Sequence, residues 1–143
     1  MSSPELDNLV WIGKLKAEPP SARELNGLLA SARARLKDAG NAGLSFDSRF
    51  DLAYNAAHAL ALFALRRMGY RSDSRYLVFH CLSHTTAMPA ATWRVLAKAH
   101  ERRNLAEYEG HLERDDRLLA DLIAAAESLR GTVEALPDPN PIP

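Results

Sequence analysis

One long apolar segment, residues 46–68, constrains the fold of this chain more than any other feature. The segment contains no proline or glycine, and its apolar residues recur at helical spacing: Phe46, Phe50, Ala53, Ala57, Leu60, Ala64 and Met68. Most of its other positions are apolar too, and a helix that is apolar almost all round lies inside a bundle instead of on its surface. The sequence therefore predicts a central, mostly buried helix.

Three polar residues, Asp51, Asn55 and His58, interrupt this apolar helix. They stand at i, i+4 and i+7, so their side chains form one stripe along the helix. Buried polar groups need hydrogen-bonding partners, so another element must bring donors or water to the stripe. The stripe is the first functional candidate, and the alternative is that His58 is a core histidine satisfied by a neighbouring carboxylate.

Further helices are expected on both sides of the central one. Ser21 followed by Glu24 has the capping-box pattern, and the helix that begins there ends near Gly40. The other expected helices cover residues 4–16, 73–86 with Ser72 as the cap, 89–108 and 111–136. We find no strand-like alternation. The sequence predicts an all-α fold, an up-and-down bundle of four to five helices, with an N-terminal arm (1–20), one helical domain (21–136) and a proline-rich tail (137–143).

Charge and composition narrow the choice of function. The 18 Lys and Arg residues balance the 18 Asp and Glu residues, so the chain lacks the overall positive field of a strong nonspecific nucleic-acid binder. The longest apolar run, residues 59–65, is far shorter than the about 18 residues that a membrane span needs. The single cysteine, Cys81, fits a reducing compartment. We expect a cytoplasmic protein with no membrane partner.

The densest group of reactive side chains lies in residues 100–111, HERRNLAEYEGH. On a helix, His100, Asn104 and Tyr108 share one face, and Arg103 with Glu107 can form an i, i+4 ion pair on the neighbouring face. The alternative is an ordinary solvated helix end with salt bridges.

His80 and His84 also stand at i, i+4, the spacing at which two imidazoles of one helix can bind one zinc ion. No glutamate follows His80, and Cys81 points elsewhere on the helix, so hydrogen-bonded histidines are the favoured interpretation. A phosphate-binding glycine loop, a dinucleotide fingerprint and a nucleophile elbow are all absent from the sequence. We therefore expect no metal and no cofactor.

Several short motifs, taken in order, resemble the HEPN superfamily (higher eukaryotes and prokaryotes nucleotide-binding), and in particular its small stand-alone bacterial members. The motifs are Phe50-Asp51-Leu52-Ala53-Tyr54-Asn55-Ala56-Ala57-His58, then Gly69-Tyr70-Arg71, then Arg103-Asn104 with Tyr108-Glu109-Gly110. The resemblance covers residues 21–136, and the order and spacing of the motifs carry it. It implies an all-helical, commonly dimeric protein, and many members are metal-independent endoribonucleases of toxin or antiviral systems.

The superfamily signature is an arginine, often followed by a polar residue, and then a histidine five to seven positions after the arginine. Arg103 and Asn104 match its first part, but Tyr108 stands five positions after Arg103, and His111 stands eight positions after it. A phenol, with a pKa of about 10, transfers protons poorly at neutral pH, so this departure favours phosphate binding over cleavage unless His58 supplies the imidazole. The candidate catalytic residues are Arg103, Asn104, Tyr108 and His58, and the candidate substrate-binding residues are Asp51, Asn55, Arg71 and Arg102.

Two functions follow from the sequence. The first is nucleic-acid or nucleotide-phosphate binding, whose catalytic form would be a ribonuclease toxin. It is favoured by four arginines at one end of the central helix: Arg66, Arg67, Arg71 and Arg75. The second is a non-catalytic, homodimeric interaction module, either an antitoxin or the partner of a nucleotidyltransferase, and the neutral charge balance favours it. A continuous basic cleft that includes Arg103 would support RNA contact, whereas dispersal of the arginines into separate ion pairs would not.

Overall fold

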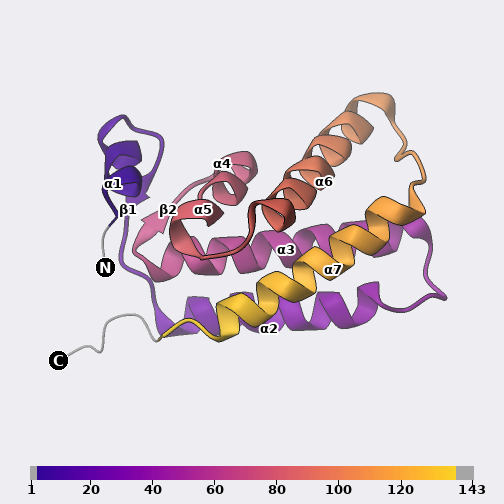
Figure 1. Ribbon diagram of the computed structural model, residues 1–143, viewed down its shortest axis with the longest axis horizontal. Coiled ribbons are helices and arrows are strands. Elements are labelled where there is room, and N and C mark those ends of the chain that lie inside the picture. Colours follow the sequence, from indigo (N-terminus) through magenta and orange to yellow (C-terminus); the bar gives the residue numbers. More distant parts are fainter. Residues whose placement is uncertain (1–2, 138–143) are drawn as a thin grey trace.

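The chain forms an all-α helical bundle, as the sequence predicts. The computed structural model describes residues 3–137 (Figure 1). Its helices are α1 (Pro4–Trp11), α2 (Ala22–Ala39), α3 (Phe46–Arg67), α4 (Arg75–His80), α5 (Leu82–Thr85), α6 (Ala90–Glu109) and α7 (Asp116–Glu134). The described residues also contain two short strands, β1 (Lys16–Ala17) and β2 (Tyr70–Arg71).

The predicted central helix is confirmed as α3, which packs against α2 and α7 along its length and against α4 and α6 on its other side (Figure 1). Its core positions include fully buried Phe50, Leu60 and Leu65. Small alanines lie between these large side chains and let the neighbouring helices approach closely. Of the polar stripe, Asn55 and His58 are half-buried between helices, whereas the Asp51 side chain is 52% exposed.

Local capping fixes the ends of the long helices. The Ser21 hydroxyl accepts from the backbone N–H of Glu24 at 3.1 Å, which confirms the predicted cap of α2. Ser45 caps α3 in the same way through the N–H of Ser48. At the end of α6, Gly110 has a φ of 79°, a left-handed conformation that stops the helix.

The N-terminal arm differs from the prediction. Its helix ends at Trp11, not at residue 16, because Gly13 takes a φ of 80° and turns the chain. Residues 16–17 then pair antiparallel with residues 70–71, Lys16 opposite Arg71 and Ala17 opposite Tyr70. Two-residue strands are too short to show alternation in a sequence, so this small sheet was missed.

The segment after α3 also differs from the prediction. The expected helix over 73–86 is divided at Cys81 into α4 and α5, and Ser74, not Ser72, caps it. The indole Nε1 of Trp93 donates to the Phe79 carbonyl at 2.6 Å. A continuous helix would use that carbonyl for the N–H of Ser83, so a contact from α6 accounts for the break.

The last helix begins at Asp116, five residues later than predicted, because the Asp115 carboxylate accepts from the N–H of Leu118 at 2.9 Å and caps it there. Residues 138–143, the greater part of the predicted tail, lie outside the described residues.

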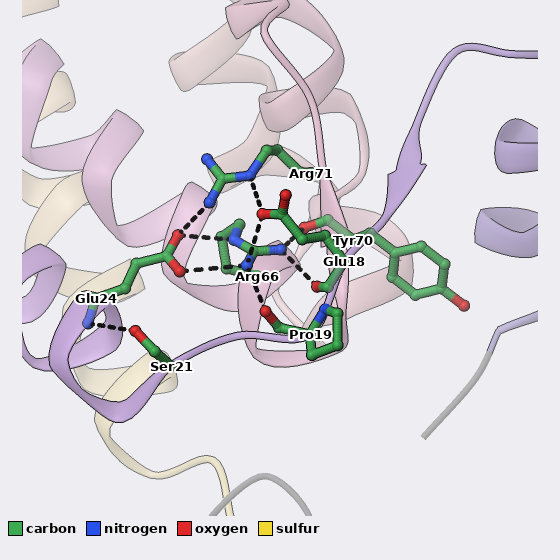
Figure 2. A network of polar contacts seen from close by, with 7 residues as sticks. All are labelled: Glu18, Pro19, Ser21, Glu24, Arg66, Tyr70 and Arg71. Atoms are coloured by element: carbon green, nitrogen blue, oxygen red, sulfur yellow. Dashed lines mark hydrogen bonds and ion pairs between the residues drawn. The ribbon is translucent and has the colours of Figure 1, made fainter.

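A buried arginine fastens the N-terminal arm to the end of α3 (Figure 2). The Arg66 side chain is 1% exposed, and its guanidinium binds the Glu24 carboxylate with both Nε (2.7 Å) and Nη2 (3.2 Å). Its remaining N–H groups donate to the backbone carbonyls of Glu18, Pro19 and Tyr70. All five donors of this arginine are therefore satisfied, as a buried charge requires.

Candidate functional site

The polar stripe of α3 meets α4 and α6 at its N-terminal half. Asp51 forms an ion pair with Arg103 of α6, with 3.2 Å between Oδ1 and Nη1. Asn55 accepts from Nη1 of Arg75 at 2.9 Å, at the start of α4. Residues far apart in the sequence thus gather around one turn of the central helix.

Tyr54 stands at the centre of this group. Its hydroxyl contacts Nδ1 of His100 at 2.8 Å, and the other ring nitrogen of His100 contacts the Asn104 amide at 3.1 Å. With the Asn104 amide in this orientation its nitrogen donates, so Nε2 of His100 accepts and Nδ1 carries the ring proton. The imidazole therefore joins Tyr54 of α3 to Asn104 of α6.

Two guanidinium groups flank the Tyr54 ring. The guanidinium carbon of Arg75 lies 5.5 Å from the ring centre and that of Arg103 lies 5.3 Å from it. Both distances are within the range of a cation–π contact. We call Tyr54, Arg75, His100, Arg103 and Asn104 the tyrosine cluster.

Burial controls the protonation of the cluster and of the nearby stripe. Desolvation, with smaller effects of Arg75 and His100, lowers the pKa of His58 from 6.5 to about 4. Desolvation and the charge of Arg75 also lower the pKa of His100. Desolvation raises the pKa of Tyr54, although Arg75 and Arg103 oppose that shift. At neutral pH the two imidazoles and the phenol are therefore uncharged, and the charges acting on the site include those of Arg75, Arg103, Asp51 and Glu107.

A cleft of about 210 Å³ opens beside the cluster, between the start of α3 and the end of α6. Arg103 and His111 line it together with three carboxylates, those of Asp47, Asp51 and Glu107. Three negative groups against one arginine make this cleft unfavourable for a phosphodiester.

The structure brings together some of the predicted site residues and separates others. Asp51, Asn55, Arg103 and Asn104 lie in or beside the tyrosine cluster. Tyr108 is 94% exposed and points away from it. His58 packs edge-on against Phe79, with 5.8 Å between the ring centres, so it does not meet Tyr108 across a crevice as the hypothesis required.

The remaining predicted contacts are dispersed. Arg71 pairs with Glu18 and Glu24 in the network around Arg66 (Figure 2), and Arg102 lies 3.7 Å from Asp115. Arg67 donates to the carbonyl of Pro137. The arginines at the end of α3 therefore do not form a continuous basic cleft with Arg103.

Sequence reasoning missed Tyr54 as a site residue and gave His100 no role. Tyr54 had a signal: it stands three residues after Asp51 and four before His58, within the polar stripe. The pair His100 and Asn104 also stood at i, i+4. Residue spacing could not predict that the face of α3 with Tyr54 packs against the face of α6 with His100 and Asn104.

Neither a metal site nor a membrane span is found in residues 3–137. No group of three or more His, Cys, Asp or Glu residues could hold a metal ion. His80 lies between two aromatic rings, stacked on Tyr76 at 5.8 Å and edge-on to Trp93 at 5.5 Å. Within the same residues no helix is long and apolar enough to cross a membrane.

Comparisons with known proteins do not identify the chain: no protein-family model, curated protein or solved structure matches it.

Proposed function

We propose that this protein is a HEPN-like protein that binds a nucleotide through its phosphate at the tyrosine cluster. The observation that carries the proposal is Arg75, whose exposed guanidinium is held by Asn55 and by the Tyr54 ring. No carboxylate lies within 4.0 Å of Arg75 in residues 3–137. An arginine oriented by neutral neighbours keeps N–H groups available for a bidentate contact with phosphate.

The local charge supports the same proposal. Arg75 and Arg103 carry two positive charges, and Asp51 cancels one of them. Burial keeps His58 and His100 neutral, and the nearby carboxylates of Asp51 and Glu107 lie beside Arg103, so the charge of the cluster without a carboxylate partner in residues 3–137 is that of Arg75. That charge suits a single phosphate better than a polynucleotide backbone, which needs several cations in a row.

Binding is favoured over cleavage. Metal-free RNA cleavage needs a group that takes the 2′-hydroxyl proton. Both ring nitrogens of His100 are already engaged by Tyr54 and Asn104, and His58 is half-buried and packs against Phe79. His111 does lie beside Arg103, but in the cleft with three carboxylates.

Calorimetric titration with AMP and with inorganic phosphate tests the proposal. Arg75→Ala should weaken AMP binding at least tenfold, since charge-assisted hydrogen bonds are lost. The matched control is Arg102→Ala, another arginine of the charged region, which should change the affinity less than twofold. Asp51→Asn should tighten binding up to about fivefold, because Asp51 competes with the phosphate for Arg103.

Two results would contradict this function. Equal affinities for the Arg75→Ala and Arg102→Ala variants would remove Arg75 from any site. Cleavage of a labelled RNA by the wild type in EDTA, abolished by Arg103→Ala, would establish a ribonuclease instead.

The outer face of α6 favours a second function, a homodimeric interaction module. Only Leu96 and Ala99 of this 20-residue helix are buried. An exposed stripe with alternating three- and four-residue spacing runs along it: Ala91, Arg94, Lys98, Glu101, Leu105 and Tyr108. Leu105 is 49% exposed and Tyr108 is 94% exposed.

Antiparallel pairing of two copies of α6 would bury this stripe and place Lys98 of each copy against Glu101 of the other. Light scattering after size exclusion should then show a dimer. Lys98→Glu should convert it to a monomer, and the double change Lys98→Glu with Glu101→Lys should restore it. A wild type that remains monomeric when the protein concentration in the light-scattering experiment is raised 100-fold would exclude this function.

A further inference from the structure

Tyr76 is an exposed aromatic ring at the edge of the tyrosine cluster. It occupies the first turn of α4, directly after Arg75, and the residue is 57% exposed. One face of its ring stacks on His80, with 5.8 Å between the ring centres and 16° between the ring planes. Within residues 3–137, His80 is the one aromatic ring stacked on Tyr76; the His100 ring lies 6.2 Å away and is tilted by 45°, so it does not stack.

The Tyr76 ring is supported by two further aromatic rings. His80 is wedged between Tyr76 and Trp93, since it packs edge-on against the indole at 5.5 Å. The indole is in turn fixed by its hydrogen bond to the Phe79 carbonyl. The Tyr76 ring is stacked on one side and the residue is 57% exposed, which suits a stacking ligand. A side chain that is already ordered loses little conformational entropy when the ligand binds.

Tyr76 also lies close to the phosphate site. Its ring centre is 6.2 Å from that of His100, whose Nδ1 contacts the Tyr54 hydroxyl. Arg75, the preceding residue, packs on the Tyr54 ring. A nucleotide carries its base one ribose away from its phosphate, so the base platform and the cation must both lie at one site, and Tyr76 and Arg75 both lie against the Tyr54–His100 pair.

We propose that the free face of Tyr76 stacks on the base of the bound nucleotide, so that the site selects an aromatic base as well as a phosphate. This inference rests on the proposed function, because it takes the phosphate to lie at Arg75 and Arg103. Stacking uses the π face that every base has and does not read the hydrogen-bonding edge. Purines should therefore bind more tightly than pyrimidines, with no strong preference between adenine and guanine.

The test compares AMP, UMP and ribose 5-phosphate as ligands of the wild type and of four variants. Tyr76→Ala and Tyr76→Leu should weaken AMP binding about 5- to 150-fold, the effect of one base–aromatic stack. Both should leave the affinity for ribose 5-phosphate within twofold of the wild type. Tyr76→Phe keeps the ring and should bind AMP like the wild type. Trp11→Ala, which removes an exposed aromatic ring of α1, is the matched control.

The outcomes separate the two proposals. If AMP and ribose 5-phosphate bind the wild type equally well, the base platform is wrong and the phosphate site stands. If Tyr76→Ala weakens both ligands to the same extent, Tyr76 acts on the phosphate and stacks on no base. If neither ligand binds the wild type at millimolar concentration, the phosphate site itself is wrong and the platform fails with it. Because the Tyr76 side chain is largely exposed, all four variants should melt within a few degrees of the wild type.

Discussion

Replacement of Glu24 by glutamine tests whether the buried Arg66 network holds the N-terminal arm on the bundle. The Glu24 carboxylate accepts two bonds from Arg66, at 2.7 and 3.2 Å, and one from Arg71 at 2.8 Å. Glutamine removes the negative charge and turns one of the two acceptor atoms into a donor that faces a guanidinium N–H. The Arg66 charge would then be buried without its principal counter-ion.

The size of the effect follows from the burial of the two partners. Removing one partner of a buried ion pair costs about 3–5 kcal/mol. Glu24 is 26% exposed, and the Glu18 carboxylate remains 3.3 Å from Nη2 of Arg66, so we expect about 2–3 kcal/mol. For a chain of this length that loss lowers Tm by roughly 6–10 °C.

Glu18→Gln is the matched control in the same network. The Glu18 side chain is 48% exposed, and exposed ion pairs contribute about 0–1 kcal/mol. Urea unfolding followed by circular dichroism measures both losses. Losses within about 0.5 kcal/mol of each other in the two variants would refute the reasoning from burial.

The network also predicts how the loss depends on pH. The hydrogen bond from Arg66 lowers the pKa of Glu24 below its usual 4.5 in the folded state. A depressed carboxyl pKa contributes stability that is fully present above the unfolded pKa and is lost as pH falls through the folded pKa. The difference in stability between the wild type and Glu24→Gln should therefore be constant above pH 5 and shrink below pH 4.5.

Three further predictions concern the core. Burial lowers the pKa of His58 to about 4, so NMR should show a neutral His58 down to about pH 5. The free energy of unfolding should therefore fall as the pH is lowered from 6.5 to about 4, and His58→Phe should remove that fall. Leu60→Ala should cost about 2–5 kcal/mol in urea unfolding, because Leu60 is fully buried, whereas Leu105→Ala on the exposed face of α6 should cost less than about 0.5 kcal/mol. Cys81 is buried with its pKa raised to about 11, so it should react with a thiol reagent only after unfolding.

The parts of the fold that the sequence predicts well are those decided by neighbouring residues. The central helix was placed to within one residue at its C-terminus, because its apolar period and the Gly69 that follows Met68 are local signals. The cap of α2 at Ser21 was found for the same reason. The division of α4 from α5 was not predicted, because the Trp93 indole that takes the Phe79 carbonyl comes from another helix.

The candidate site shows the same limit. Helical spacing gives the residues that share a face, so Asp51 and Asn55 were correctly grouped, and so were His100 and Asn104. Spacing says nothing about which face of a second helix lies opposite. Tyr108 was included for its position on α6, yet it points into solvent.

The arginines show why a count of residue types could not separate scaffold from site. Arg66 gives all five of its donors to protein acceptors and is 1% exposed, so it can bind no ligand. Arg75 gives one N–H to Asn55, lies on the Tyr54 ring and pairs with no carboxylate in residues 3–137. What makes an arginine a binding residue is the number of its N–H groups that the fold leaves unused, and that number depends on acceptors from distant parts of the chain. The arginines at the end of α3 thus differ in their partners: Arg66 and Arg71 hold the arm, Arg67 binds the Pro137 carbonyl, and Arg75, at the start of α4, is the one we propose for an anion.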